Sequence, residues 1–150
     1  MLLINIAGNP IPWKRTGQRV IANSVINYDR QKLEKERTRW QIRAHYEEPP
    51  MTTPLAMEIT FFMPIPKGTS KKKTTQMQTG FIRHMKRPDI DNLQKYILDT
   101  MTGHVYVDDA QIDSLNVRKQ YSTNPRTVIE ITPGTNNPVI ESTVEEDDFY

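Results

Sequence analysis

Two pairs of aspartates have the residue types and spacing for chemistry: Asp89 with Asp91, and Asp108 with Asp109. Lys95 follows Asp91 by four residues, so on a helix both side chains lie on one face. Carboxylates without His or Cys favour Mg²⁺ or Mn²⁺ over zinc. A metal ion held here would polarise a phosphoryl oxygen and generate hydroxide, while Lys95 would stabilise the developing charge. These residues therefore favour phosphodiester hydrolysis.

Each group of acids also has a purely structural explanation. Asp89 and Asp91 precede an apolar helical pattern and are ordinary capping residues, and Asp91, Lys95 and Asp99 could form a surface ion-pair ladder. Asp108 and Asp109 could simply form a turn. However, four like charges within about twenty residues are costly unless a cation neutralises them. A short helix followed by a tight return could bring the two pairs together.

The elements that must position these residues predict a single α+β domain with a mixed or antiparallel sheet and helices packed on it. Alternating or β-rich runs predict five strands, and helical spacing with flanking caps predicts two helices. The strands are Leu2–Ala7, Leu55–Pro64, Val105–Val107, Asp113–Tyr121 and Arg126–Ile131, and the helices are Arg30–Tyr46 and Asp91–Met101.

The first of these helices is charged and only thinly apolar. Its apolar residues Leu33, Trp40, Ile42 and Ala44 predict one narrow buried stripe. Residues 11–27, around Trp13, have no sustained period and predict a basic loop, and residues 66–87 predict a mobile basic loop.

Charge is distributed unevenly along the chain. Five of the 18 acids lie in residues 137–150, which contain no base, so the remainder has 20 basic against 13 acidic residues and a net charge of +7. Such a body attracts polyanions, which it would contact through phosphates without reading sequence. The predicted DNA contacts are Lys14, Arg15, Arg19, Lys71, Lys72, Lys73, Arg83, Lys86 and Arg87. We expect a domain over residues 1–134 and a disordered acidic tail over residues 135–150.

Several protein classes are excluded or disfavoured. The chain has no Cys, which excludes a disulfide framework and a thiolate nucleophile. It has neither a secretory signal nor an apolar run long enough to cross a bilayer, so we expect a soluble, cytoplasmic protein without membrane contact. A Gly-rich phosphate loop is also missing, which argues against a nucleotide cofactor.

Two linked motifs resemble the RusA family of Holliday junction resolvases: RPDIDNLQK at residues 87–95 and VYVDDAQI at residues 105–112. The resemblance covers roughly residues 2–132. It implies a homodimer that binds four-way DNA junctions and makes paired, symmetric nicks with Mg²⁺ or Mn²⁺, in recombination and repair. A stand-alone resolvase of this size suits a bacteriophage or prophage.

By position, the resemblance makes Asp89, Asp91 and Asp109 catalytic, metal-binding carboxylates and Lys95 the catalytic lysine. Asp108 would assist at the metal. The supporting positions around this site are Asn92 and Asp99.

Two features depart from the family pattern, namely the long basic segment at residues 67–86 and the acidic tail. The segment could wrap DNA, and the tail is either a solubilising terminus or a mobile competitor for the basic surface. Trp13 and Tyr28 could stack on bases or belong to the core.

Two other functions remain open at this stage. A non-catalytic DNA-binding or packaging accessory protein would keep the basic surface without cutting. A nucleotidyl- or glycosyltransferase would use the Asp-x-Asp motif for a nucleotide-bound metal, although the missing Gly-rich loop disfavours it.

Overall fold

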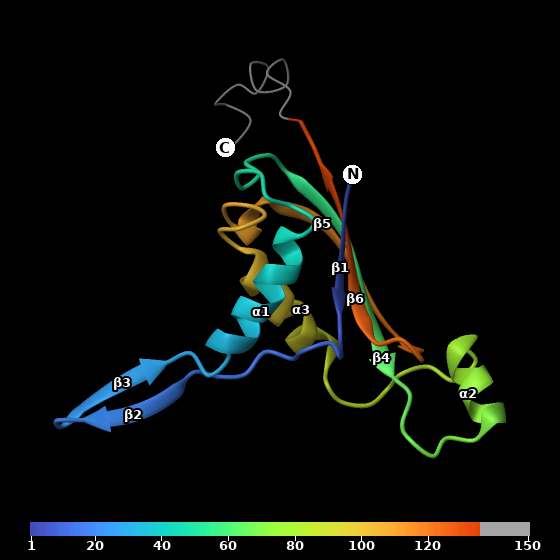
Figure 1. Cartoon of the computed structure of the whole chain (residues 1–150). Helices are drawn as coiled ribbons and strands as arrows, with labels where there is room; N and C mark the ends of the chain where they lie inside the picture. The colour runs from blue at the N-terminus through green and yellow to red at the C-terminus, as the bar shows by residue number, and fades with distance from the viewer. Residues whose placement is uncertain (136–150) are drawn as a thin grey trace, which may run out of the picture.

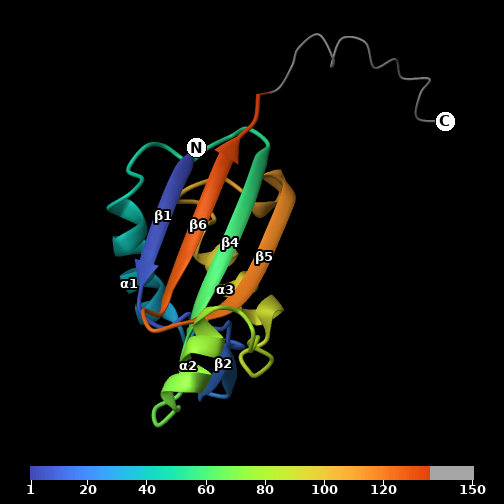
Figure 2. The same ribbon diagram turned by 90° about the vertical axis from the view of Figure 1, so that its right-hand side faces the viewer.

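Four strands form one twisted sheet in the order β1-β6-β4-β5 (Figure 2). The strands are β1 (Leu2–Ala7), β4 (Leu55–Pro64), β5 (Ile112–Ser122) and β6 (Arg126–Pro133) in this computed structural model, which describes residues 1–135. The last strand, β6, lies between β1 and β4 and is antiparallel to both, whereas β4 and β5 are parallel. The sheet is therefore mixed, and the predicted α+β class is confirmed.

Parallel pairing of β4 with β5 requires a long crossover connection. That connection carries two helices, α2 (Lys71–Gln78) and α3 (Ile90–Met101). It also contains the basic segment and both aspartate pairs. The crossover thus determines where the candidate site lies relative to the sheet.

The core lies between one face of the sheet and two helices, α1 (Lys32–Arg43) and α3 (Figures 1 and 2). Strand β4 alternates as its sequence predicts, with every second side chain buried. Helix α3 adds an apolar stripe to this face, because its buried residues recur at three- and four-residue spacing. The buried side chains of these two elements are Leu55, Met57, Ile59, Phe61, Met63, Leu93, Tyr96, Ile97, Thr100 and Met101.

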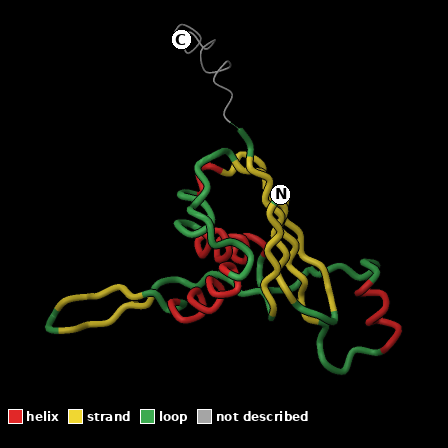
Figure 3. Tube along the Cα trace, turned by 45° about the horizontal axis from the view of Figure 1, so that its top comes forward, coloured by secondary structure: helices red, strands yellow, loops and turns green. Residues whose placement is uncertain are grey.

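Residues 17–28 form a hairpin, so the prediction of a basic loop was wrong here. Strands β2 (Gly17–Ile21) and β3 (Ser24–Tyr28) pair with each other and project away from the body (Figures 1 and 3). Ala22 and Asn23 connect them with positive φ angles of 49° and 63°, the conformation that a two-residue hairpin turn requires. Because only Gly17 of the hairpin is buried, its sequence lacks the alternation that reveals a half-buried strand.

The predicted mobile basic loop contains helix α2, so this prediction was also partly wrong. Ser70 caps the helix, because its Oγ accepts a hydrogen bond of 3.3 Å from the backbone N–H of Lys73. No residue of α2 is buried, so the helix lacks the apolar stripe by which helices are recognised in a sequence.

Two smaller predictions were also wrong. Residues 105–107 are not a strand: Tyr106 makes only isolated bridges to Met51 and Thr102. In α1, Leu33 and Trp40 are exposed, and the buried stripe consists of Lys35, Thr38 and Ile42.

The predicted acidic tail lies outside the described residues, apart from its first position. In residues 1–135, no helix is long and apolar enough to cross a membrane.

Candidate active site

The first aspartate pair lies at the start of α3. Asp89 is the N-cap residue, with extended backbone angles of −68° and 146°, and Asp91 lies in the first turn. The Asp89 carbonyl accepts the first helical hydrogen bond from the Leu93 N–H at 3.2 Å. Both carboxylates are exposed. The predicted helix and its start are confirmed, and this end of α3 offers two solvent-accessible acids.

Lys95 lies one turn further along α3 and packs on an aromatic ring. Its Nζ is 3.7 Å from the centroid of Trp13, a cation–π contact that holds the ammonium group in place. The backbone N–H of Trp13 donates to the backbone carbonyl of Asn92 at 2.9 Å, which ties the Trp13 main chain to the same helix. Trp13 therefore has a role that the sequence did not indicate, namely positioning the predicted catalytic lysine.

A buried glutamine secures the loop that carries Trp13. Gln31 is almost fully buried; its amide donates to the Pro12 carbonyl and its Oε1 accepts from the Lys14 N–H, both at 2.8 Å. Removing either partner of a buried hydrogen bond leaves the other unsatisfied at a cost of about 1–3 kcal/mol. The loop therefore has a defined position against α3.

A basic hollow of about 460 Å³ adjoins Asp89. It is lined by one acid, Asp89, and five cationic side chains: Arg83, Lys86, Arg87, Arg118 and Lys119. Lys119, on β5, donates from its Nζ to the carbonyls of Lys86 and Pro88 at 2.9 and 3.0 Å. The strand thus holds the segment just before Asp89, and the hollow is suited to an anion.

A second hollow, of about 630 Å³, touches Asp89 from another direction and includes Trp13, Arg87 and Asn92. Arg87 and Asp89 line both hollows. Asp89 therefore lies where two concave surfaces meet, beside the cations that would contact a phosphate.

The second aspartate pair has a different environment. Asp109 begins a short 3-10 turn (Asp109–Gln111) directly after Asp108. A hydrogen bond with Asp108 raises the pKa of Asp109 above its usual range, with smaller contributions from burial and from the charges of Asp108 and Asp99. A bound cation would stabilise the ionised form of a carboxyl group in these surroundings.

Gln111 fixes the turn that carries this pair. Its amide donates to the carbonyls of Met51 and Thr53 at 2.8 and 3.0 Å, and its Oε1 accepts from the Asp108 N–H at 2.9 Å. The Gln of the second motif therefore acts as an anchor for the adjacent acids.

The structure does not bring the two pairs together in one chain. A twelve-residue helix is about 18 Å long, and Asp109 lies near Asp99, toward its far end. Strand β5 must then run back to Lys119 before it reaches the Asp89 end. Within residues 1–135, no three acidic or His side chains form a cluster that could hold a metal ion. The expected convergence is thus wrong for a single chain, because the turn closes at the opposite end of α3.

Asp99 has a structural partner on α1. The Lys35 Nζ lies 2.9 Å from both Asp99 and Asp29, and the lysine side chain is only 11% exposed. Burial alone would lower the pKa of Lys35, but hydrogen bonds with the two carboxylates outweigh it and raise the pKa. Asp99 therefore neutralises a buried cation, and the predicted ladder with Lys95 gives way to a contact between helices.

The predicted DNA-binding residues occupy four regions. Lys14 and Arg15 lie in the loop after β1, and Arg19 stacks on Tyr28 in the hairpin, with its guanidinium 5.3 Å from the ring centroid. The first turn of α2 carries Lys71, Lys72 and Lys73, while Arg83, Lys86 and Arg87 line the basic hollow. Figure 1 shows the hairpin and α2 projecting to opposite sides at the end of the molecule where β4 finishes.

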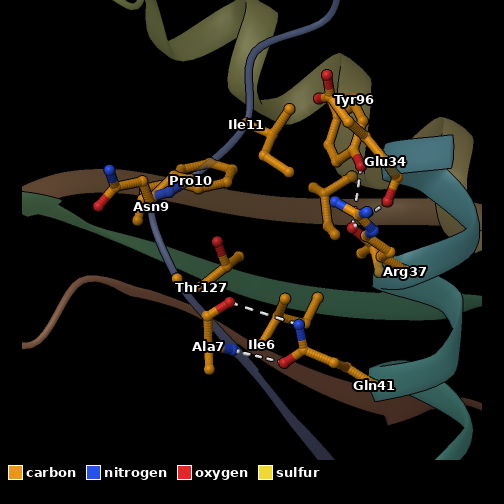
Figure 4. A pocket seen from close by; sticks show the side chains of 14 residues that line it. Ile6, Ala7, Asn9, Pro10, Ile11, Glu34, Arg37, Gln41, Tyr96 and Thr127 are labelled. Carbon is orange, nitrogen blue, oxygen red and sulfur yellow. Dashed lines mark hydrogen bonds between the residues drawn. The ribbon is translucent and has the colours of Figure 1, made fainter. Parts of the chain in front are cut away.

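Another hollow, of about 280 Å³, lies between α1, α3 and the end of β1 (Figure 4). Tyr96 and Thr38 share a hydrogen bond of 2.9 Å on its wall, and Glu34 and Arg37 lie at its edge. None of the four aspartates lines it. This hollow is therefore separate from the candidate site.

Trp13, Gln111 and Lys119 are the site residues that sequence reasoning did not assign. The cation–π contact joins positions 82 residues apart and leaves no local pattern. Gln111 lies within the second motif, and its adjacency to Asp108 and Asp109 was the available signal. Lys119 lies in a strand whose charged residues have the ordinary appearance of a solvated face.

An α+β domain that places exposed carboxylates beside a cationic hollow has the features of a nuclease. Residues 7–132 match the family model described as endodeoxyribonuclease RusA, and the chain belongs to this family.

Two curated relatives are similar over part of their length. The crossover junction endodeoxyribonuclease rusA of Lactococcus phage r1t is 40% identical over 80 residues, which are 53% of this chain and 54% of the relative. The uncharacterized protein YqaN of Bacillus subtilis (strain 168) is 36% identical over 89 residues, 58% of this chain and 63% of the relative. The similarity thus spans between half and two thirds of each relative.

Proposed function

We propose that this protein is a divalent-metal-dependent endodeoxyribonuclease that resolves four-way DNA junctions by paired, symmetric nicks. The observation that carries the proposal is the start of α3, where Asp89 and Asp91 are exposed and Asp89 adjoins a hollow lined by five cationic side chains. Membership in the RusA family and the similarity to a phage crossover junction endodeoxyribonuclease support it. Roles in recombination and repair follow from the same proposal.

The side chains fit a hard divalent cation. Asp89, Asp91 and Asp109, assisted by Asp108, offer only carboxylate oxygens, which Mg²⁺ and Mn²⁺ prefer. The neighbouring Asp108 raises the pKa of Asp109, and a bound cation would stabilise its ionised form. When bound, the metal supplies the positive charge that polarises a phosphoryl oxygen and activates water.

The protein's other groups would position the DNA strand and stabilise charge. Lys95, held against Trp13, lies on the same helical face as Asp91 and would stabilise the negative charge that develops on the phosphate or leaving oxygen. The cations of the basic hollow would hold the neighbouring backbone phosphates. Asn92 and Asp99 would support the site indirectly, since their observed partners are Trp13 and Lys35.

A homodimer would resolve the separation of the two aspartate pairs. One chain keeps Asp89 and Asp91 at the start of α3 and Asp109 near its end. In a two-fold dimer with α3 helices running in opposite directions, the second copy would place its Asp109 beside the first copy's Asp91. We therefore propose that each metal site draws carboxylates from both copies, which would also place two sites for symmetric nicking.

Incubation of the purified protein with four-way junction, duplex and flap DNA, with and without Mg²⁺, tests the activity. We expect paired nicks in the junction only when the metal is present. Salt-sensitive junction binding without any metal-dependent product would instead identify a non-catalytic DNA-binding protein. Competition for the site by a nucleotide would point to a transferase.

Mixing two inactive variants tests the shared site. If Asp91 of one chain and Asp109 of the other form one site, a heterodimer of Asp91→Asn and Asp109→Asn chains has both defects in one site and an intact second site. The mixture should then nick one strand, although neither variant nicks alone. If each chain builds its own site, every site keeps one defect and the mixture stays inactive.

A further inference from the structure

Residues 81–85, between α2 and the start of α3, expose a row of three side chains. Phe81 and Met85 are 79% and 92% exposed, and Arg83 between them is also exposed. The alternate side chains turn inward: Ile82 packs against the core, and His84 lies against Tyr121 with 4.8 Å between ring centroids. Exposed and partly buried side chains thus alternate over residues 81–85.

The row is held in place at several points. The Ile82 N–H donates to the Gln76 carbonyl at 2.9 Å, which ties the segment to α2. The contact of His84 with Tyr121 and the hydrogen bond from Lys119 to the Lys86 carbonyl tie it to β5. An exposed aromatic on an anchored segment loses little conformational freedom when it binds a partner.

The surroundings of the row indicate a polyanion as that partner. Arg83 and Met85 line the basic hollow, whose five cations face a single acid, Asp89. Such a surface would repel a basic protein surface and attract a phosphate backbone. Aromatic and apolar side chains that alternate with basic residues are typical of surfaces on which unpaired nucleobases stack.

The row offers both contacts that an unpaired nucleotide makes, namely apolar surface at Phe81 and Met85 and a cation at Arg83. Bases that lie along this row would leave their phosphates facing Arg83 and the rest of the hollow.

We propose that Phe81, Arg83 and Met85 form a binding site for unpaired nucleotides, with Phe81 and Met85 packing against bases and Arg83 contacting their phosphates. The site leads to Asp89 and would hold the strand that opens beside the branch point of a junction. Its placement beside a cutting site rests on the proposed function, whereas its ability to bind single-stranded DNA does not.

Fluorescence anisotropy with a labelled single strand of about 16 nucleotides tests the site directly. The Phe81→Ala/Met85→Ala double variant should bind this strand roughly tenfold more weakly, since it loses the surfaces against which bases stack. Its affinity for a duplex should stay within about twofold, because duplex bases are already stacked. Arg83→Ala should weaken binding to both DNAs. It should also reduce the slope of log affinity against log salt concentration by about one, because one phosphate contact is lost.

Leu33→Ala provides the matched control, since Leu33 is an exposed apolar residue on α1. It should leave single-strand affinity unchanged, and Phe81→Trp should preserve it. Unchanged single-strand binding by the double variant overturns the proposal. A shift of the double variant from dimer to monomer in sedimentation also overturns it, because the row would then contact a second copy. Absent nicking by a wild-type protein that binds the strand would overturn the proposed function instead.

Discussion

The two ends of α3 carry aspartate pairs in opposite electrostatic surroundings. At the start of the helix, Asp89 adjoins five cationic side chains, and Lys95 lies one turn beyond Asp91. Beyond its end, the pKa of Asp109 is raised by Asp108, with smaller contributions from burial and from a third acid, Asp99. The first pair has its compensating charges within the chain, whereas the second does not.

This difference separates two tasks that a nuclease site combines. Cations beside carboxylates suit the binding of a phosphate, and crowded carboxylates suit the binding of a metal ion. A single chain has the two tasks at opposite ends of one helix. Two copies of the chain would therefore complete each site together.

The largest expected effect comes from removing one carboxylate at each end. Asp91→Asn and Asp109→Asn should each reduce junction nicking by at least about a hundredfold, since loss of one group that stabilises a transition state costs this much. Junction binding by Asp91→Asn should stay intact or become tighter, because one charge that repels phosphate is gone. Quantitative nicking and gel-shift assays measure the two properties separately.

Asp113→Asn, at an exposed position on β5, is the control and should change nicking by less than about twofold. A severe defect in Asp91→Asn with nearly full activity in Asp109→Asn would break the comparison, because the acidic end would then have no part in the reaction. Unchanged nicking by Asp91→Asn would contradict the nuclease proposal itself.

A smaller loss should follow when Lys95 loses its aromatic support. Trp13→Ala should lower kcat roughly tenfold and leave junction affinity unchanged, because the indole holds Lys95 and is expected to act through it. Lys95→Ala should cost about a hundredfold. Trp13→Phe should restore most of the activity, since a phenyl ring keeps a cation–π surface. Equal losses in kcat and affinity for Trp13→Ala would instead indicate a direct contact with DNA.

Stability should respond to the ion pair that joins α1 to α3. Asp99→Asn leaves Lys35 with Asp29 alone and should lower the free energy of unfolding by about 1 kcal/mol, since Asp99 is half exposed and solvent screens part of the contact. Urea denaturation measures this change. Glu36→Gln, at an exposed position on α1, should have no measurable effect. A large loss of nicking with unchanged stability would assign Asp99 to the reaction instead.

The smallest expected effect concerns the raised pKa of Asp109, beyond the end of α3. Because the folded protein raises the pKa of Asp109, ionisation of this group at neutral pH destabilises the fold, and the penalty disappears as pH falls toward 3.8. Asp109→Asn should therefore raise the free energy of unfolding at pH 7 by less than about 1 kcal/mol, which a slightly higher melting temperature would show. This gain should shrink toward pH 4. Mg²⁺ should stabilise the wild type more than this variant. Equal gains at both pH values would contradict the raised pKa of Asp109.

The sequence predicted the elements that bury a regular apolar pattern. Strand β4 follows from its alternation, helix α3 from its helical spacing and β1 from an apolar run that ends at a turn. The hairpin and α2 were missed because neither buries an apolar face.

For the candidate site, the sequence identified the acids and Lys95 but not their arrangement. The contact between Trp13 and Lys95 and the burial of Lys35 depend on how distant elements pack, and a lysine within a helix ordinarily indicates a solvated surface. The predicted convergence of the aspartates failed because the spacing of two motifs does not specify at which end of a helix the chain returns. The DNA-binding assignments remain predictions.

The central position of β6 has a consequence for the order of folding. This strand comes last among the described elements, yet it joins β1 to β4, so β1 has no partner strand, and β4 has only β5, until residue 133 has been synthesised. Both aspartate pairs leave the ribosome before the sheet that supports α3 can close. A nascent chain is therefore expected to lack a formed site, which would delay any DNA cutting until the whole sheet has assembled.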